Sequence, residues 1–284
     1  MNLTNEITIL TEVLQLSETD LSKKLGVSME TINNWKFDRK GIALANLEKI
    51  YSYAYDNGIK LNNLYEQILK EEYENDQNLV LFHGAKRAFS MPIDFLANSK
   101  SNNDFGVGFY LGESFEQGAN YISVLNQNFV YCFCLNMRNL KTYAFNVNTE
   151  WMIAISYFRG WLNDYKGNPL IQQLIGKLSE CDVIIAPIAD NRMFDIIAEF
   201  VGNEITDEQC RHALAATNLG NQYVLKTKKA VAGMSLLKEM FVCQKEKNNF
   251  LANRASLANN GSQKVKLARI QYKNKGRYIE EILQ

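Results

Sequence analysis

Three short segments of the chain bring polar and aromatic side chains together with glycines. An apolar run at residues 79–82 ends in His83-Gly84, and a glycine-spaced loop then leads into a second apolar run that holds Tyr110. Tyr121 follows eleven residues after Tyr110, on a stretch with helical spacing. This order predicts a strand, a loop, a strand and a helix, with a polar ring at one strand end and aromatic rings opposite it.

The three segments resemble the nicotinamide end of an ADP-ribosyltransferase of the poly(ADP-ribose) polymerase type. Such enzymes carry a His-Gly at a strand end, a Gly-x-Gly-φ-Tyr segment, and an Ala-Asn-Tyr at the spacing that Tyr110 and Tyr121 keep. The family's third element is a strand that opens with Asn-Glu-Tyr, and Asn221-Gln222-Tyr223 stands in its place. The resemblance covers about residues 79 to 230. It points to an uncharacterised bacterial branch marked by Asp-Phe-Gly-x-Gly-Phe-Tyr and a later Gln-Tyr-Val strand.

The resemblance implies that NAD is the substrate and assigns a function to each residue. The nicotinamide–ribose bond breaks through an oxocarbenium-like sugar, so the protein must hold ribose and ring while positive charge builds. His83 would hydrogen-bond the adenosine-side ribose, the Gly84 backbone would pair with the carboxamide, and Tyr110 and Tyr121 would sandwich the nicotinamide. Arg87 could meet the pyrophosphate. Each motif alone is also typical of an ordinary turn or core, and their joint spacing favours the functional interpretation.

Two positions depart from the family pattern. A serine that helps to hold the carboxamide is replaced by Gly118, and the family glutamate, which stabilises the charge on the ribose, is replaced by Gln222. The loss of one well-placed electrostatic group costs on the order of 10²–10³ in rate. The catalytic set would therefore be His83, Tyr110 and Gln222, suited to a single transfer or to NAD binding without turnover. Asp190, for charge stabilisation or target activation, and Arg192, for a phosphate, are candidates for replacement groups.

Residues 1–70 form a helical unit in this interpretation. Their pattern resembles a phage-repressor-type helix-turn-helix bundle, with a helix holding Leu21 and Leu25, a turn at residues 26–28, and a second helix. Residues 1–75 carry eight Lys and Arg against twelve Asp and Glu, a net charge of −4, whereas duplex binders have a basic footprint. DNA and a protein partner, such as an antitoxin or a second copy, therefore remain open. In the DNA interpretation the contact residues are Thr31, Asn33, Asn34 and Lys36.

The remaining pattern predicts an α+β fold. The irregular mixture of strand-like and helical runs indicates a split antiparallel sheet with helices, of the ADP-ribosyltransferase kind, rather than a doubly wound sheet. We expect an acidic linker at 71–78, the catalytic unit at 79–235 and a basic extension at 236–284. In the extension we expect a helix around residues 236–241 and a strand at 263–272. Residues 226–284 have a net charge of +9, suited to a nucleic-acid target, to the acidic N-terminal region, or to neither.

The composition bears on where the protein acts and on whether it needs a metal. The chain has 284 residues, 46% of them hydrophobic, without an apolar run of membrane-spanning length and with a polar, acidic start in place of a secretory signal. Five cysteines without a Cys-x-x-Cys and two histidines without a ligand cluster argue against a metal site. We expect a cytoplasmic protein that needs no metal and no membrane.

These observations lead to one functional hypothesis and two alternatives. The first is an NAD-dependent mono-ADP-ribosyltransferase that modifies a protein or nucleic acid, in the setting of a bacterial toxin or anti-phage effector; that setting is an analogy. The second is a helix-turn-helix transcription regulator whose other domain senses NAD or ADP-ribose without catalysis. The third is a non-enzymatic interaction protein.

Overall fold

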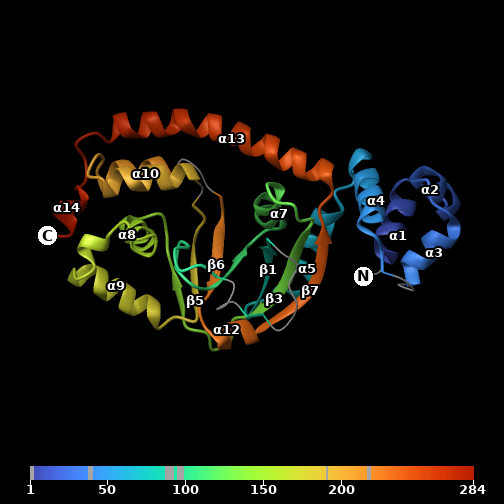
Figure 1. Cartoon of the computed structure of the whole chain (residues 1–284), viewed down its shortest axis with the longest axis horizontal. Helices are drawn as coiled ribbons and strands as arrows, with labels where there is room; N and C mark the ends of the chain where they lie inside the picture. The colour runs from blue at the N-terminus through green and yellow to red at the C-terminus, as the bar shows by residue number, and fades with distance from the viewer. Residues whose placement is uncertain (1–2, 38–40, 87–92, 95–98, 190, 216–218) are drawn as a thin grey trace.

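The structure is a computed structural model that describes residues 3–37, 41–86, 93–94, 99–189, 191–215 and 219–284. A small helical bundle lies at one end, a sheet crosses the middle, and a second group of helices lies at the other end (Figure 1). The helix α13 (Gln244–Gln271) runs along one side and contacts α4, α7 and α11. It therefore connects all three parts.

Within the described residues, the N-terminal bundle contains four helices separated by turns. The Ser17 side chain accepts from the backbone of Asp20 at the start of α2, and Gly26 ends α2 with a φ of 63°, which glycine adopts without strain. Leu21, Ile32 and other apolar side chains form its core, as the helical spacing predicts. Its helices are α1 (Thr4–Val13), α2 (Glu18–Leu25), α3 (Met29–Phe37) and α4 (Leu44–Asp56). The next helix, α5 (Leu61–Tyr73), lies mainly against the sheet, where Tyr65 packs in one core with Val80 and Phe82 (Figure 1).

A seven-stranded sheet forms the centre, in the order β4-β5-β6-β2-β1-β3-β7. The mixture of helices and sheet confirms the predicted combination of α and β structure. The prediction of a purely antiparallel sheet is wrong at one pair, because β4 and β5 run parallel. The strands are β1 (Asn78–Gly84), β2 (Phe109–Gly112), β3 (Phe129–Asn136), β4 (Thr142–Ala144), β5 (Val183–Pro187), β6 (Asn221–Leu225) and β7 (Met234–Phe241).

Helices cover one face of this sheet in two groups. Phe82, Gly112, Gln222 and Ala186 are successive partners in one row across four strands, so they point to the same face. Phe82 packs against α7, and Ala186 packs in the core formed with α8 and α10. These helices are α7 (Phe115–Ser123), α8 (Thr149–Phe158), α9 (Pro169–Ser179), α10 (Asn191–Val201), α11 (Asp207–Ala215) and α14 (Ile279–Ile282), with a 3-10 turn at Asn163–Tyr165. The short helix α12 (Lys228–Ala232) belongs to the other face, where Ala230 packs with Leu81 and Leu111.

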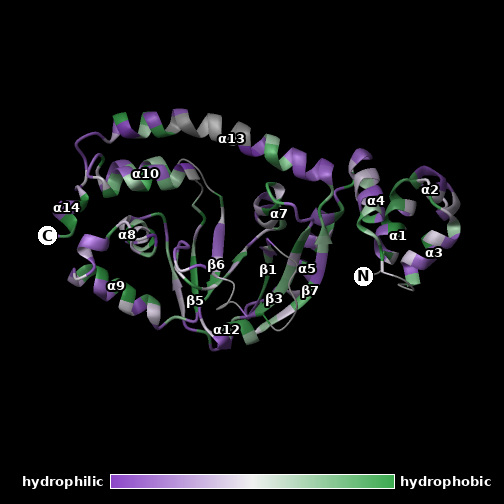
Figure 2. Cartoon of the chain, in the orientation of Figure 1, coloured by the Kyte–Doolittle hydropathy of each residue, from purple (hydrophilic) through white to green (hydrophobic). Residues whose placement is uncertain are grey.

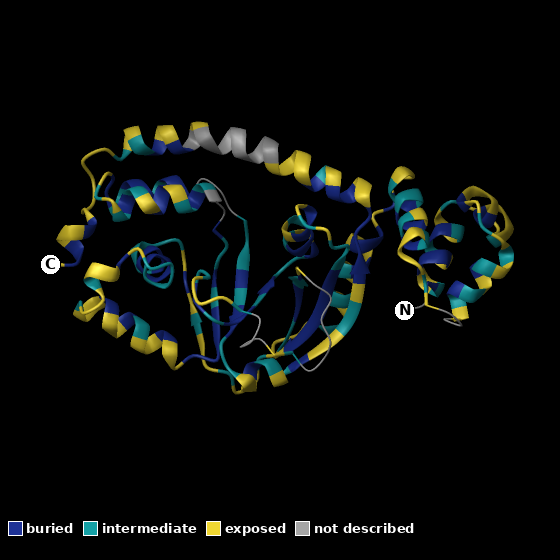
Figure 3. Cartoon of the chain, viewed as in Figure 1, coloured by how far each residue is buried: buried dark blue, intermediate teal, exposed yellow. Residues whose placement is uncertain are grey.

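The neighbouring strands β5 and β6 differ in hydropathy. The strand β5 is hydrophobic along most of its length, whereas β6 begins with hydrophilic residues, among them Gln222 (Figure 2). Buried residues dominate the central strands, while α9 and both ends of α13 expose one side (Figure 3). A polar side chain at the start of β6 is therefore held next to the core rather than in open solvent.

The C-terminal region corrects two predictions. Residues 234–241 form the edge strand β7 instead of a helix, because they pair with β3 along its whole length. Residues 263–272 lie largely in the helix α13 instead of a strand, and Val265 and Ala268, three residues apart, bury one side of it.

The segment predicted as a linker, residues 71–78, is partly helix and strand. The helix α5 continues to Tyr73, and β1 begins at Asn78.

The bundle is joined to the edge strand by buried polar contacts. The Glu6 carboxylate, 1% exposed, accepts from Lys238 Nζ at 3.1 Å and from the Tyr51 hydroxyl at 3.2 Å. Lys238 Nζ also lies 3.7 Å from the centre of the Tyr65 ring. The buried Asn62 amide donates to the Phe241 carbonyl at 2.8 Å. These contacts fix the helical unit on the sheet rather than leaving it on a free tether.

We expect Lys238→Met to destabilise the chain by roughly 3 kcal/mol, because it leaves the Glu6 carboxylate buried without its ion partner. Methionine keeps the apolar stem beside Tyr65. Urea unfolding of the full chain measures the effect. Adding Glu6→Gln to the same chain should recover most of the loss, and equal unfolding midpoints for Lys238→Met and the parent chain would contradict the assignment.

Candidate functional site

The His83 side chain links β1 to β2 beyond the point where the two strands pair through their backbones. These strands share a single register pair, Phe82 with Gly112, and the next link is His83 Nδ1, which lies 2.7 Å from the Tyr110 carbonyl oxygen. A carbonyl only accepts, so Nδ1 carries the proton and Nε2 is the acceptor nitrogen. Burial lowers the pKa of His83 to about 4, against a smaller opposite effect of the Tyr110 bond. His83 is therefore neutral near pH 7, and its ring stacks on Phe109 with centroids 4.4 Å apart.

Two glycines allow α7 to lie directly against the end of β1. A Cβ atom on Gly84 would lie 2.5 Å from the Gly118 carbonyl oxygen and 3.1 Å from Tyr121 Cδ1. A Cβ atom on Gly118 would lie 2.8 Å from Cγ1 of the buried Val130. The same approach brings Tyr121, 47% exposed, beside the Gly84 backbone. A serine at position 118, which the sequence resemblance leads us to expect, would not fit beside Val130.

Tyr110 uses its hydroxyl to hold the loop that precedes β2. The hydroxyl donates to the Gly106 carbonyl at 2.7 Å and accepts from the Phe105 backbone at 3.1 Å. Burial raises the pKa of Tyr110 well above its usual value, so the phenol stays protonated. Tyr110 thus binds the loop through its hydroxyl and binds His83 through its backbone carbonyl.

Gln222 is buried at the start of β6 and is bonded to a carboxylate. Its Nε2 donates to Asp104 Oδ2 at 3.1 Å and to the Pro187 carbonyl at 3.4 Å. Arg159 donates to the other carboxylate oxygen, Oδ1, from NH2 at 2.7 Å and from Nε at 3.3 Å. Sequence reasoning missed Asp104 as a site residue, although it opens the Asp-Phe-Gly segment that carries the resemblance.

A partly buried lysine, Lys226, also holds this loop. Lys226 Nζ donates to the Val107 carbonyl at 2.6 Å and to the Phe105 carbonyl. Burial lowers the pKa of Lys226 to about 8. Gln222 and Lys226 lie four residues apart and therefore share a side of the strand. Together with Tyr110 they fix residues 104–107 over the sheet.

Several predicted site residues lie elsewhere. Arg87 and Asp190 fall outside the described residues. Arg192 lies in the first turn of α10, directly after β5. Of the residues proposed for DNA, the Thr31 hydroxyl is 2.9 Å from that of Ser28 in the cap of α3, and Lys36 pairs with Glu18 at 2.5 Å. Asn33 is exposed and Asn34 partly so.

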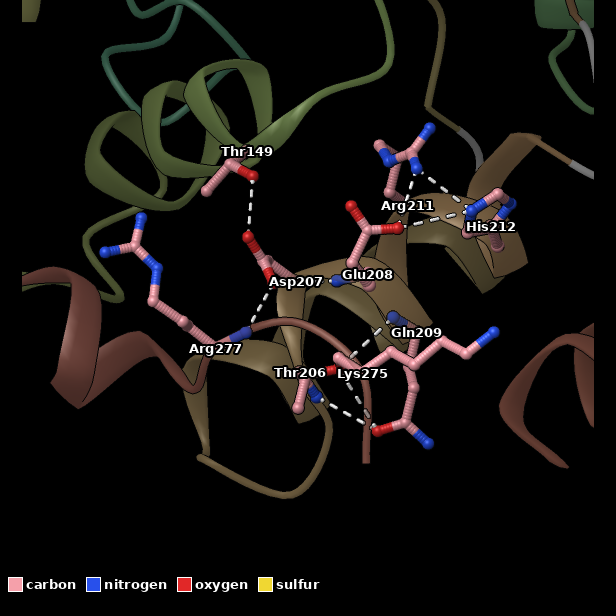
Figure 4. A network of polar contacts seen from close by, with 9 residues as sticks. All are labelled: Thr149, Thr206, Asp207, Glu208, Gln209, Arg211, His212, Lys275 and Arg277. Atoms are coloured by element: carbon pink, nitrogen blue, oxygen red, sulfur yellow. Dashed lines mark hydrogen bonds and ion pairs between the residues drawn. The ribbon is translucent and has the colours of Figure 1, made fainter. Parts of the chain in front are cut away.

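A second polar cluster joins α8, α11 and the C-terminal segment (Figure 4). Asp207 accepts from the Thr149 hydroxyl at 3.2 Å and from the Arg277 backbone at 2.8 Å. Arg211 and His212 both lie beside Glu208, at 2.7 and 3.3 Å. The His212 ring stacks on Tyr272 with centroids 3.5 Å apart. The cluster holds the C-terminal segment against α11, and His212 is one of its packed members.

The described part of the chain offers no other obvious reactive centre. All five cysteines are buried without a disulfide, and burial raises the pKa of Cys132 to about 12. Among the described residues no group of three or more His, Cys, Asp or Glu is arranged to hold a metal ion. Within the same residues, no helix combines the length and the apolar character needed to cross a membrane.

Comparison with known proteins gives one match. A family model described as "Protein of unknown function (DUF3990)" matches residues 79–236, from the first residues of β1 into β7. No curated protein and no solved structure matches the chain. The matched segment includes His83, Asp104, Tyr110 and Gln222 and leaves out the helical bundle.

We expect the stability of the chain to depend on His83 at mildly acidic pH. Unfolded His83 binds a proton below about pH 6.5, whereas folded His83 stays neutral to about pH 4. Its contribution is therefore complete above pH 6.5 and is lost as the pH falls through this range. His83→Asn, which keeps a donor near Nδ1, should weaken that dependence in urea unfolding at pH 7.5, 6 and 5. A pH dependence that changes with His212→Asn but not with His83→Asn would overturn the assignment.

We expect Gly118→Ser, which introduces the serine of the enzymes that the sequence resembles, to destabilise the chain by about 1–3 kcal/mol, since the buried Val130 leaves no room for the side chain. Thermal unfolding measures this. Gly176→Ser is the matched control, because Gly176 also lies on a helix but a Cβ there meets nothing within 4 Å. Combining Gly118→Ser with Val130→Ala should restore part of the loss. A Gly118→Ser chain as stable as the parent would show that α7 is not in tight contact.

Proposed function

The chain belongs to the family described as protein of unknown function (DUF3990), and we propose that it is an NAD-dependent mono-ADP-ribosyltransferase acting on a macromolecule. One observation carries the proposal: the approach of α7 to the end of β1, which sets the Tyr121 ring beside the Gly84 backbone. A bare backbone next to an accessible aromatic ring suits a flat amide-bearing ring such as nicotinamide. His83 and Tyr110 support it, because they tie the neighbouring strand to the same place.

The proposed reaction breaks one bond and forms another at the same carbon. The bond between the ribose C1′ and the nicotinamide nitrogen breaks, and its electron pair leaves with nicotinamide, which becomes neutral. An oxygen or nitrogen of the acceptor attacks C1′, and its proton passes to a base or to water. Gly84 and Tyr121 would hold the leaving ring, while Gln222 would bond a ribose hydroxyl. Because Gln222 carries no charge, a single transfer is a better match than polymer elongation.

The setting proposed for this activity is a cytoplasmic bacterial toxin or anti-phage effector. The helical bundle would then bind a partner that restrains or directs the enzyme. The net charge of −4 over residues 1–75 and the Lys36–Glu18 pair favour a protein, such as an antitoxin, over a DNA duplex.

A second candidate function is a transcription regulator that senses NAD or ADP-ribose without turnover. The buried Gln222 amide favours it, because an amide binds a hydroxyl but stabilises a developing cation poorly. Both candidates require NAD or ADP-ribose to bind, and only the first releases nicotinamide.

We expect the purified chain to release nicotinamide and to transfer label from NAD labelled in its adenylate part to protein or nucleic acid in a lysate. His83→Ala should lower both by about 10²-fold or more, since it removes the link that fixes Tyr110 beside Gly84. His212→Ala is the matched control, because it removes the chain's other histidine from the cluster in Figure 4. Binding of NAD without nicotinamide release would establish the sensor instead. A chain that binds neither NAD nor ADP-ribose would refute both candidates.

A further inference from the structure

The orientation of the Gln222 amide is set by its partners. Asp104 Oδ2 and the Pro187 carbonyl both accept hydrogen bonds, so the atom that faces them is the donor Nε2. The carbonyl oxygen Oε1 is consequently the atom that can accept from a ligand hydroxyl. With the side chain only 8% exposed, the amide has little room to flip. Gln222 is thus a fixed acceptor rather than an adaptable one.

Asp104 holds that orientation and is itself held from two sides. Arg159 binds Oδ1 and Gln222 binds Oδ2, so the guanidinium and the amide occupy different sides of the carboxylate. The Arg159 guanidinium lies 3.3 Å from the centre of the Phe194 ring. At Gln222 the nearer charge is therefore the carboxylate. Its attraction for positive charge is screened less here than in water, because the Asp104 side chain is only 13% exposed.

We propose that Asp104 is a positioning residue that, through Gln222, gives the site the negative charge its amide lacks. This inference rests on the proposed function. Asp104 accepts from Nε2, polarises the amide and so strengthens Oε1 as an acceptor for a ribose hydroxyl. Its charge also favours the cation that develops on the sugar when nicotinamide leaves. In this arrangement the carboxylate stands one hydrogen bond behind position 222 instead of on it.

Because Asp104 lies beside Gln222, the change Gln222→Glu would not simply add a useful negative charge to the site. Gln222→Glu would set two carboxylates about 3 Å apart, where they repel and one takes up a proton. The Asp104→Asn single change removes the charge and leaves Arg159 without its ion partner. The double change Asp104→Asn/Gln222→Glu exchanges amide and carboxylate, so that the new amide at position 104 can donate to the new carboxylate at position 222 and the charge is restored.

The test measures kcat and KM for nicotinamide release, with the melting temperature, in four chains: the parent, the two single variants and the double variant. Asp104→Asn should lower kcat on the order of 10²-fold, with a smaller change in KM. Gln222→Glu should not raise kcat above the parent value, because the shared proton leaves the pair with the parent's single negative charge. The double variant should recover at least a tenth of the parent kcat. Asp182→Asn is the control, because Asp182 is a paired, 11% exposed carboxylate before β5, at the end of the strand away from Pro187. It should lower the melting temperature and leave kcat unchanged.

Two results would overturn the inference. An Asp104→Asn chain with the parent kcat would show that the ion pair only anchors α8 to the loop. A double variant that melts like the parent but stays as slow as the Asp104→Asn chain would show that the charge does not act through position 222. Failure of the proposed function looks different, because the parent chain itself then neither binds NAD nor releases nicotinamide, and the inference falls with it.

Discussion

The close contact between Gly84 and α7 is the constraint on which the site depends. The Gly118 carbonyl oxygen occupies the space that a Cβ atom at position 84 would need, so no other residue fits there unless the helix moves. The position of Tyr121 beside the Gly84 backbone follows from this contact. Position 118 is limited in a similar way by the buried Val130 of β3. A contact of this kind is fixed by sterics.

Around that contact, polar groups replace sheet hydrogen bonds where the strands separate. His83 reaches across to the Tyr110 carbonyl, while Tyr110, Gln222 and Lys226 hold the 104–107 loop over the sheet. Each of these groups is partly or fully buried, and each has a partner of matching type, which is what makes a buried polar network stabilising rather than costly. The same network supplies the fixed donors and acceptors that a site for charged chemistry needs.

Local patterns predicted much of the fold, and long-range contacts account for the failures. The strand that ends at Gly84, the strand of Tyr110 and the capped helices of the bundle were readable, since their signals lie within a few residues. The segment of β7 has apolar spacing that fits a helix equally well, and pairing with β3, about a hundred residues away in sequence, decides it. Likewise Asp104 meets Gln222 across 118 positions, so no local signal joins them. The parallel β4–β5 pair and the Glu6–Lys238 contact also join residues that are far apart in the sequence.

The most direct measurement is a crystal structure of the chain with benzamide, a stable analogue of nicotinamide. We expect the carboxamide to bond to the Gly84 backbone, the ring to lie against Tyr121, and the Gln222–Asp104 bond to remain. A ring bound instead in the hollow lined by Phe145, Met193 and Leu219, or no ring near Gly84 at saturating benzamide, would contradict this expectation.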